Sequence, residues 1–372
     1  MTSPDLIVVG AGIIGLATAY RAHRQGMAVH VIDSADRPVG SSIQNFGHAC
    51  FTGQADLIQD VGRSARAGWL EAAGDVGLWA EESGTYIPAT TELEMQVLEE
   101  FAGHRGGGEV TLLNSESVAQ AIGNPDLQAV GGAHLPLDVR VNPREAAPRL
   151  AAWLAKQGVE FTWNTHVTGV GDGVVATSRG DVRAGQVVVC PGYRLMELFP
   201  ELAERHEVRV CTLAMSLIER PSRIPQGLGM LTGTSLTRYD GFAAMPSVPA
   251  LRDELARREP ELVSHIANLM VTGIDQGLLV GDSHAYSLSP EPFIDEDVAQ
   301  LLLDKAMPLL GIARPTVKQR WLGRYADSPT TNLLLERPDS KTTVAVVTSG
   351  IGMTLSFGIA ELVVEGGSVE GF

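Results

Sequence analysis

Short apolar runs and glycine-rich turns alternate at the start of the chain. Leu6–Val9 is an unbroken aliphatic run, which is typical of a strand buried on both faces of a parallel sheet. Apolar residues at helical spacing follow from Leu16 to Tyr20, the pattern stops at Gly26, and a second strand-like run covers residues 28–33. This order predicts a strand, a helix and a second parallel strand, which is how an α/β fold begins.

The turn between the first strand and the helix contains Gly10, Gly12 and Gly15. In a G-x-G-x-x-G turn the first glycine allows the tight turn, the second lets the backbone approach a pyrophosphate, and the third lets the helix pack against the strand. The helix N-terminus then presents free N–H groups to phosphate oxygens. Asp33 ends the second strand, where its carboxylate can accept hydrogen bonds from ribose hydroxyls. The complete order of these features predicts a dinucleotide-binding site.

From residue 208 onward, strand-like runs alternate with turns, which predicts an antiparallel sheet. A charged helix interrupts this sheet, and its Arg and Glu residues are expected to form a solvated face. The last part of the chain predicts one more parallel strand and a closing helix. The expected strands are Val208–Ile218, Met230–Ser235, Leu269–Gly273, Leu278–Gly281 and Thr343–Thr348. The expected helical regions are Asp60–Leu98, which is mostly helix with a break at Gly84, Pro143–Gln157, Leu251–His265 and Leu355–Glu365.

The pattern as a whole predicts a two-domain α/β protein. We expect a Rossmann-type cofactor domain, discontinuous in sequence, over residues 1–80, 140–210 and 326–372. We expect an α+β substrate domain, built on the antiparallel sheet, over residues 81–139 and 211–325. The segments of the two domains interleave along the chain, so the ligand crevice should lie at their interface and beyond the carboxyl ends of the parallel strands.

Composition excludes several kinds of function. The formal net charge is −16 and the isoelectric point is about 5.0, so we expect no nucleic-acid partner and no anionic membrane surface. Cys50, Cys190 and Cys211 have no C-x-x-C spacing, which argues against a disulfide scaffold and against a zinc site. The N-terminal apolar run is broken by glycines and resembles neither a signal peptide nor a membrane span. We therefore expect a cytoplasmic protein without a metal.

Three further segments extend the dinucleotide pattern. Gly40–Gly47, Gly185–Gly192 and Thr348–Thr354 resemble, in this order, cofactor segments of the FAD-dependent D-amino-acid oxidase superfamily, which includes glycine oxidase and sarcosine oxidase. With the first unit the resemblance spans residues 5 to 360, and it implies bound FAD. Some relatives link the flavin covalently to a His or a Cys. This chain has Gln44 at the first of these positions and no Cys after Cys211, so noncovalent FAD is expected.

The resemblance also implies which residues contact FAD. Most lie in glycine-containing turns. The implied cofactor-binding residues are Gly10, Ala11, Gly12, Ile13, Ile14, Gly15, Asp33, Ser34, Ser41, Ser42, Asn45, Phe46, Gly47, Val167, Cys190, Pro191, Gly192, Gly350, Ile351, Gly352, Met353 and Thr354.

A flavin carries the redox chemistry itself, so the protein must position a C–H bond against flavin N5. His284, in the segment G-D-S-H-A-Y, resembles an active-site His of sarcosine oxidases. Arg324 and Tyr325 follow W-L-G in a segment that resembles the family's W-x-G-x-R, whose Arg binds the substrate carboxylate, although here the Arg comes one residue early. We predict that all three residues are catalytic. A buried structural His and interdomain ion pairing or packing are the alternative interpretations.

The segment Asn45–Gln54 narrows the expected substrate. Its N-F-G and later G-Q, together with G-D-S-H, resemble a bacterial subgroup associated with aminophosphonate catabolism. Thr354 and Val280 stand where some sarcosine oxidases carry a carboxylate-binding and an oxygen-activating Lys. A phosphonate would require a local basic pocket, for which His48, Arg324 and His284 are candidates. The predicted substrate-binding residues are His48, Gln54, Tyr286 and Thr354.

We therefore expect an FAD-dependent amine oxidoreductase. It would oxidise the C–N bond of a small zwitterionic amine by hydride transfer to flavin N5, giving an imine that hydrolyses to an aldehyde. 2-Aminoethylphosphonate or its N-methyl derivative is the favoured substrate, and oxygen or another acceptor takes the electrons, an oxidase being favoured over a dehydrogenase. The alternatives are a glycine, sarcosine or D-amino-acid oxidase and, from another class, an FAD-containing subunit of an electron-transfer complex.

Overall fold

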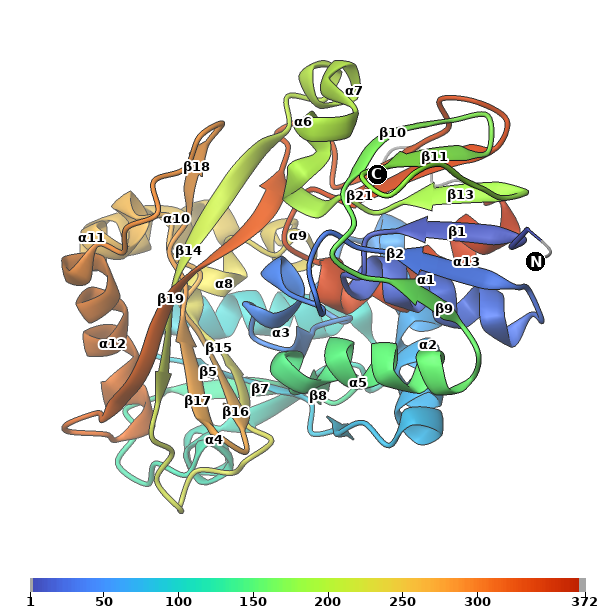
Figure 1. Cartoon of the computed structure of the whole chain (residues 1–372). Helices are drawn as coiled ribbons and strands as arrows, with labels where there is room; N and C mark the ends of the chain where they lie inside the picture. The colour runs from blue at the N-terminus through green and yellow to red at the C-terminus, as the bar shows by residue number, and fades with distance from the viewer. Residues whose placement is uncertain (1–2, 368–372) are drawn as a thin grey trace.

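Two large sheets organise the computed structural model, which describes residues 3–367 (Figure 1). The first sheet has six strands in the order β20-β21-β13-β1-β2-β9, and neighbouring strands are parallel except β20 and β21. Its strands are β1 (Leu6–Val9), β2 (Val29–Ile32), β9 (Glu160–Thr162), β13 (Gln186–Val189), β20 (Leu333–Glu336) and β21 (Thr342–Val347). Segments from the start, middle and end of the chain thus share one sheet.

Both faces of this parallel sheet are covered. Leu6 and Val8 of β1 belong to one apolar core, whereas Ile7 and Val9 belong to another on the opposite face. This alternation explains why the strand is aliphatic throughout. The first core contains α1 (Ile13–Arg24), α2 (Gln59–Val76), α5 (Pro143–Lys156) and α13 (Gly352–Glu365), and the second contains β10 (Val167–Gly171), β11 (Val174–Thr177), β12 (Val182–Arg183), α6 (Leu195–Leu198) and α7 (Pro200–Arg205).

The second sheet has nine strands in the order β18-β14-β17-β16-β15-β5-β7-β6, and β19 pairs with β14. Its neighbours are antiparallel except β15 and β5. The strands are β5 (Thr85–Ala89), β6 (Thr111–Asn114), β7 (Gly131–Leu135), β14 (Arg209–Ile218), β15 (Gly229–Leu231), β16 (Met270–Ile274), β17 (Gly277–Gly281), β18 (Ala285–Ser287) and β19 (Val317–Asp327).

Helices cover this second sheet as well, and α12 lies at the end of the molecule away from the parallel sheet (Figure 1). One face packs against α3 and α10, and the other packs against α4 and α12. A third, small sheet has the strand order β3-β8-β4, and its strands occur in the parts of the sequence that connect the two large sheets. These elements are α3 (Glu92–Arg105), α4 (Ser115–Ile122), α10 (Val248–Arg258), α12 (Glu296–Leu310), β3 (His48–Ala49), β4 (Ala80–Glu81) and β8 (Val139–Val141).

The predicted fold class is confirmed. A discontinuous parallel sheet and a mainly antiparallel sheet are both present. The last parallel strand, expected at Thr343–Thr348, is β21, and the closing helix begins at Gly352 rather than Leu355. The assigned domain boundaries stay a prediction, and their ends at residues 1–2 and 368–372 lie outside the described residues. Within residues 3–367, none of the helices has both the length and the apolarity needed to cross a membrane.

Two of the expected helical regions are wrong in part. Asp60–Leu98 is interrupted because Thr85–Ala89 forms β5, which pairs with β7 along its whole length. Thr85, Tyr86 and Ile87 have side chains that favour a strand, and Pro88 would interrupt a helix, so local propensity and the pairing with β7 act in the same direction. The charged helix expected at Leu251–His265 is split in two, since Pro260 has no backbone N–H and starts a new helix, α11 (Pro260–Ser264).

A third expected element ends early. Met230–Ser235 is extended only as far as Leu231, because a capping box formed by Thr232 and Ser235 starts a helical turn, α8 (Gly233–Leu236). This turn matters for the site because it directs the following residues, up to α9 (Asp240–Ala243), toward the cavity described next.

Candidate active site

A cavity of about 610 Å³ lies beyond the carboxyl ends of β1 and β2 and reaches the nine-stranded sheet. The structure brings nearly all of the predicted site residues to it. Of these residues only Ala11 and Gly47 do not line the cavity. The crevice is therefore where the interleaved chain predicts it, and the two exceptions act through their neighbours.

Glycine geometry fixes the first turn of the cofactor-binding end. Gly10 has a φ of +104°, and a Cβ there would lie 2.4 Å from the carbonyl oxygen of Cys190. A Cβ at Gly15 would lie 1.9 Å from the carbonyl oxygen of Gly10. A Cβ at Gly12 would lie 3.2 Å from Ser42 Oγ, on the side that faces the cavity. The cradle therefore fits a group that approaches the backbone closely, as a diphosphate does.

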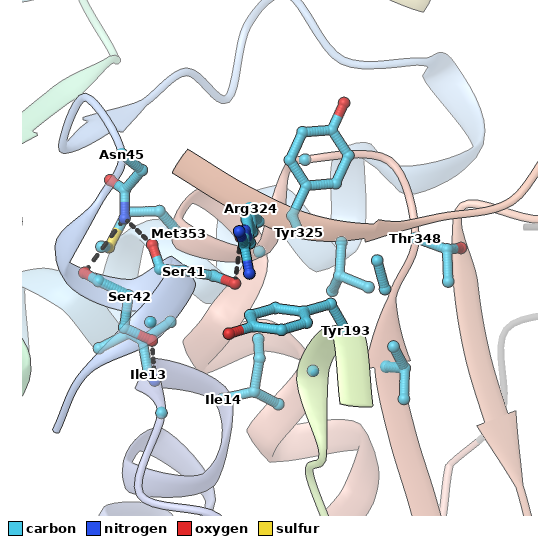
Figure 2. Close-up of a pocket in the computed structure, with 18 of the residues that line it drawn as sticks. Ile13, Ile14, Ser41, Ser42, Asn45, Tyr193, Arg324, Tyr325, Thr348 and Met353 are labelled. Atoms are coloured by element: carbon cyan, nitrogen blue, oxygen red, sulfur yellow. Dashed lines mark hydrogen bonds between the residues drawn. The ribbon is translucent and has the colours of Figure 1, made fainter. Parts of the chain in front are cut away.

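Hydrogen bonds hold the polar groups of this end in place. Asp33 Oδ2 accepts from the N–H of Ala11 at 2.6 Å, and Oδ1 accepts from the N–H of Ala35 at 2.8 Å. Each carboxylate oxygen keeps a further lone pair, which can accept from a ribose hydroxyl. Ser42 Oγ accepts from the N–H of Ile13 at 2.8 Å (Figure 2). Ala11 thus serves the site by fixing Asp33.

The segment of residues 40–47 is closed by Asn45. Its Nδ2 donates to the carbonyl oxygens of Ser41 and Ser42 at 2.8 and 3.1 Å, and its Oδ1 accepts from the N–H of Gly47 at 2.7 Å (Figure 2). A Cβ at Gly47 would lie 1.9 Å from the carbonyl oxygen of Val141. Gly47 is therefore required because the segment packs directly against the backbone of Val141. The hydrogen bonds of Asn45 fix the conformation of the segment and so set the shape of the cavity wall.

The C-terminal turn brings a second helix N-terminus to the cavity. Gly350, with a φ of +78°, lies where a Cβ would be 3.2 Å from the Tyr325 ring. Helix α13 starts two residues later, so its free N–H groups are available to an oxygen of a flavin ring. The hydroxyl of Thr354 is buried and donates to the carbonyl oxygen of His48 at 3.3 Å. Thr354 thus joins α13 to β3.

Arg238 is a cation at the far end of the cavity, and the sequence patterns did not single it out. It follows α8, is half-buried, and donates from Nη2 to the hydroxyl of Tyr286 at 3.5 Å. Burial opposes its charge, but Tyr286 and nearby acidic groups raise its pKa above the usual value. Among the ion pairs of residues 3–367, none involves Arg238. No motif marked this residue, because its place depends on the α8 turn.

Asp282 and His284 follow β17 and face the same end. Burial raises the pKa of Asp282 to about 7, although Arg238 acts in the opposite direction. The Nδ1 of His284 lies 2.9 Å from the carbonyl oxygen of Ile266, and because a carbonyl only accepts, Nδ1 donates. Burial and the charge of Arg238 lower the pKa of His284 to about 3. His284 is therefore a neutral group at neutral pH, with a lone pair on Nε2.

Adjacent residues of β19 point to opposite sides. The ring of Tyr325 lies 6.3 Å from that of His284, centroid to centroid, and burial raises the pKa of its hydroxyl well above the usual value. Figure 2 shows the side chain of Arg324 leaving the strand in a different direction, on the side of Tyr193. The structure thus brings Tyr325 to His284, and it separates Arg324 from them. We call Arg238, Asn268, Asp282, His284, Tyr286 and Tyr325 the substrate end.

His48 belongs to a buried network beside the cavity. Its Nε2 lies 2.8 Å from the hydroxyl of Thr85, which itself donates to Asp138. A hydroxyl has one proton, so His48 Nε2 must donate to Thr85. Burial and the neighbouring Arg140 lower the pKa of His48 to about 4. The expectation that His48 and His284 supply positive charge is therefore wrong, because both are neutral at neutral pH.

The same network contains His48, Cys50 and Asp138, whose potential ligand atoms lie within 4.8 Å of one another. Asp138 accepts from the N–H groups of residues 51 and 52 and from Thr85, so its oxygens are already engaged. Arg140 adds a buried positive charge. This donor set fits a structural hydrogen-bond network better than a metal. Gln54 lines the cavity and donates to the carbonyl oxygen of Cys50 at 2.7 Å.

Comparisons with known proteins agree with this geometry. The DAO family, described as FAD dependent oxidoreductase, matches residues 5–366. Glycine oxidase from Geobacillus kaustophilus has a similar fold, with a TM-score of 0.79 and 19% identity over 100% of this chain and 96% of that chain. L-α-Glycerophosphate oxidase from Mycoplasma pneumoniae, solved with FAD bound, has a TM-score of 0.75 and 16% identity over 98% of this chain and 94% of that chain.

One curated relative is similar in sequence. It is 3-oxosteroid 1-dehydrogenase from Mycolicibacterium smegmatis, which is 25% identical over 231 residues. The match covers 53% of this chain and 40% of that protein. The chain thus spans less than half of the length of this relative.

Proposed function

The chain belongs to the DAO family of FAD-dependent oxidoreductases, and from this premise we propose that it oxidises the C–N bond of a small zwitterionic amine. The observation that carries the proposal is Arg238, a half-buried cation in the cavity without a carboxylate in ion-pair contact among the described residues. A guanidinium in such a place is suited to an anionic group of a ligand, which it can bind through two parallel hydrogen bonds.

Bound FAD supplies the hydride acceptor, flavin N5. The turn at Gly10–Gly15 and Asp33 would hold its diphosphate and ribose, and the start of α13 would face the flavin ring. The substrate end then has three tasks. It binds the anion, it keeps the nitrogen of the substrate beside neutral hydrogen-bonding groups such as His284 and Tyr325, and it limits the access of water. The substrate loses a hydride from carbon and a proton from nitrogen, and water hydrolyses the resulting imine to an aldehyde.

We favour an aminophosphonate, 2-aminoethylphosphonate or its N-methyl derivative, as the substrate. The support is the N-F-G and G-Q resemblance in the segment that ends at Gln54, which lines the cavity. Thr354, which replaces the carboxylate-binding Lys of some sarcosine oxidases, is buried and bonded to β3. A guanidinium fork binds a phosphonate as well as a carboxylate, so glycine, sarcosine and D-alanine are the competing substrates.

The test is anaerobic mixing of the purified yellow protein with each of these five amines while the flavin absorbance is recorded. We expect the two aminophosphonates to bleach the flavin fastest. Bleaching by the carboxylates alone would reject the phosphonate, and bleaching by none of the five would reject amine oxidation. Admitting air after bleaching separates an oxidase, which recovers its colour within the mixing time, from a dehydrogenase, which does not.

A further inference from the structure

Asp282 is a buried carboxylate that the redox step itself does not explain. Its side chain is 7% exposed, and the residue lines the cavity. Oδ1 has no hydrogen-bond partner among the residues that the structure describes, and Oδ2 accepts from none of the other side chains described. Buried carboxylates are ordinarily hydrogen-bonded or paired, since an unpaired one costs free energy. Asp282 therefore has acceptor capacity that a ligand can use.

A structural role does not account for this carboxylate. The backbone of Asp282 is fixed by paired hydrogen bonds with Asn268, N–H to carbonyl in both directions, at 2.9 and 3.2 Å. His284 Nδ1 lies 3.9 Å from Oδ1, too far for a hydrogen bond, and its proton is donated to the carbonyl oxygen of Ile266. The backbone is thus fixed without the carboxylate, which makes no hydrogen bond to the side chains around it among the described residues.

The groups around Asp282 come from several elements. Arg238 lies after α8 and is the cation that acts on it. The remaining neighbours are uncharged at neutral pH, because burial raises the pKa of each hydroxyl or thiol and lowers that of the histidine. They are Tyr239 before α9, Cys211 on β14, Tyr325 on β19 and His284 in its own segment. A negative charge on Asp282 is therefore stabilised by one cation of this set, Arg238, and by no second one.

We propose that Asp282 binds the ammonium group of the substrate and accepts its proton before oxidation. The proposal rests on amine oxidation as the function. Asp282 enters as a carboxylate and the bound substrate enters as R–NH₂⁺–R′, where R′ is hydrogen or methyl. The products of the transfer are the protonated carboxyl and the neutral amine R–NH–R′. The neutral amine is the form that can lose a hydride from the adjacent carbon, because its lone pair stabilises the cation that forms.

Proton affinity agrees with this assignment. A carboxyl with a pKa of about 7 gives and takes protons at neutral pH, whereas His284, with a pKa of about 3, is too weak a base. Arg238 and Asp282 then form a pair of opposite charges at one end of the cavity. Such a pair favours a ligand that carries both an anion and an ammonium group over a ligand that carries only one of them.

The test compares the wild-type holoenzyme with Asp282→Asn. The probe is whichever of the five amines bleaches the flavin fastest, together with its counterpart without nitrogen, which is ethylphosphonate for 2-aminoethylphosphonate and acetate for glycine or sarcosine. Stopped-flow bleaching gives the rate constant of flavin reduction, kred, and the dissociation constant Kd of the amine. The shift of the flavin spectrum gives the Kd of the counterpart. Asp253→Asn, an exposed position on α10, makes the same change in net charge and serves as the control.

We expect Asp282→Asn to weaken binding of the amine by about 10- to 100-fold, as the loss of a charge-assisted hydrogen bond does. Binding of the counterpart should be unchanged or tighter, because the competing negative charge is gone. In the wild type and in Asp253→Asn, kred/Kd should rise about tenfold per pH unit below pH 7 and then level off. This acidic limb should be missing in Asp282→Asn.

Two results would overturn the proposal while leaving amine oxidation intact. One is an Asp282→Asn protein that binds and oxidises the amine as the wild type does. The other is an equal loss of binding for the amine and its counterpart with the acidic limb retained, which would indicate a merely structural role. A wild-type protein that no amine bleaches rejects the proposed function itself, so the two failures are distinguishable. FAD content, from the visible spectrum, verifies that each variant is a folded holoenzyme.

Discussion

The two ends of the cavity are built in different ways. At the cofactor-binding end, backbone turns form the wall, each of them carried by its own short sequence motif, and glycines are required where a Cβ would collide with the backbone, as at Gly15. At the substrate end, side chains from widely separated elements meet, among them Arg238, Asp282 and Tyr325. The difference shows that one wall is specified by local sequence and the other only by the complete fold.

The ends also differ in how their polar groups are satisfied. Asp33 accepts two backbone hydrogen bonds, and both ends of the Asn45 amide are engaged. At the substrate end, Asp282 has an unpartnered oxygen within the described part of the chain, and Arg238 has only a long hydrogen bond to Tyr286. The cofactor cradle is thus preorganised by the protein alone, whereas the substrate end holds charges that a ligand must complete.

The largest effect is expected from a Cβ in the cradle. In Gly15→Ala the new atom would lie 1.9 Å from the carbonyl oxygen of Gly10, so α1 must move away from β1. We expect FAD affinity to fall by about 100-fold or more, measured as the FAD retained after gel filtration. Gly74→Ala is the matched control, because a Cβ there meets nothing within 4 Å, and it should retain FAD fully. Full retention in Gly15→Ala would contradict a cradle fixed by local backbone contacts.

The second prediction compares the two arginines of the cavity. Arg238→Gln removes the cation of the substrate end and should raise the Kd of the amine by about 10- to 100-fold, with FAD still bound. Arg324→Gln should change the Kd less, because Arg324 leaves β19 on the side away from Tyr325 (Figure 2). Concentration-dependent flavin bleaching measures both. A larger loss in Arg324→Gln would restore the assignment made from the W-x-G-x-R resemblance and would reject Arg238 as the anion-binding residue.

This contrast explains which parts of the molecule could be predicted. The β1–α1–β2 unit was predictable, since its aliphatic strands, three glycines and Asp33 each meet a local backbone requirement within one short segment. The pairing of Thr85–Ala89 with β7 was not predictable, because β7 lies far along the chain, although the residues of the segment favour a strand. The break before Pro260 has a local cause, the proline itself, and the predicted helix was wrong there.

The residues of the site also differ in whether sequence could predict them. His284 and Tyr325 were found through short motifs, and the structure places them together. Arg238 had no motif, since it reaches the cavity only because Thr232 and Ser235 end β15 with a helical turn. Asp282 lies in the G-D-S-H segment but had no predicted role, because sequence does not show that its carboxylate is buried with Oδ1 unpartnered among the described residues.

A third and smaller effect concerns the ribose end of the cradle. Asp33→Ala would leave the N–H groups of Ala11 and Ala35 without their acceptor and would remove the carboxylate expected to bind the ribose. We expect FAD to bind about tenfold more weakly, from titration followed by flavin fluorescence. Asp36→Ala is the control and should leave FAD binding unchanged, because the exposed side chain of Asp36 pairs with the adjacent Arg37. Equal affinities in the two variants would show that Asp33 does not contribute to the cradle.

The smallest effect is expected on stability, where Asp282→Asn should stabilise the folded protein rather than destabilise it. Burial raises the pKa of Asp282 from 3.8 to about 7, so the folded protein keeps a proton that the unfolded chain releases between these values. The stability contributed by the protonated carboxyl is therefore complete below pH 3.8 and is lost as the pH rises through 7. Above pH 7 the folded protein must hold a charged, buried carboxylate whose Oδ1 has no hydrogen-bond partner among the described residues.

Asp282→Asn stays neutral at every pH, so it should be more stable than the wild type by about 1–3 kcal/mol near pH 8, and this advantage should shrink toward pH 5. Melting temperatures of both proteins across this range, with FAD in excess, measure the difference. A difference that is independent of pH would contradict the raised pKa. An advantage that grows with pH, together with weaker binding of the amine, would mean that the substrate end retains a carboxylate which the fold alone disfavours.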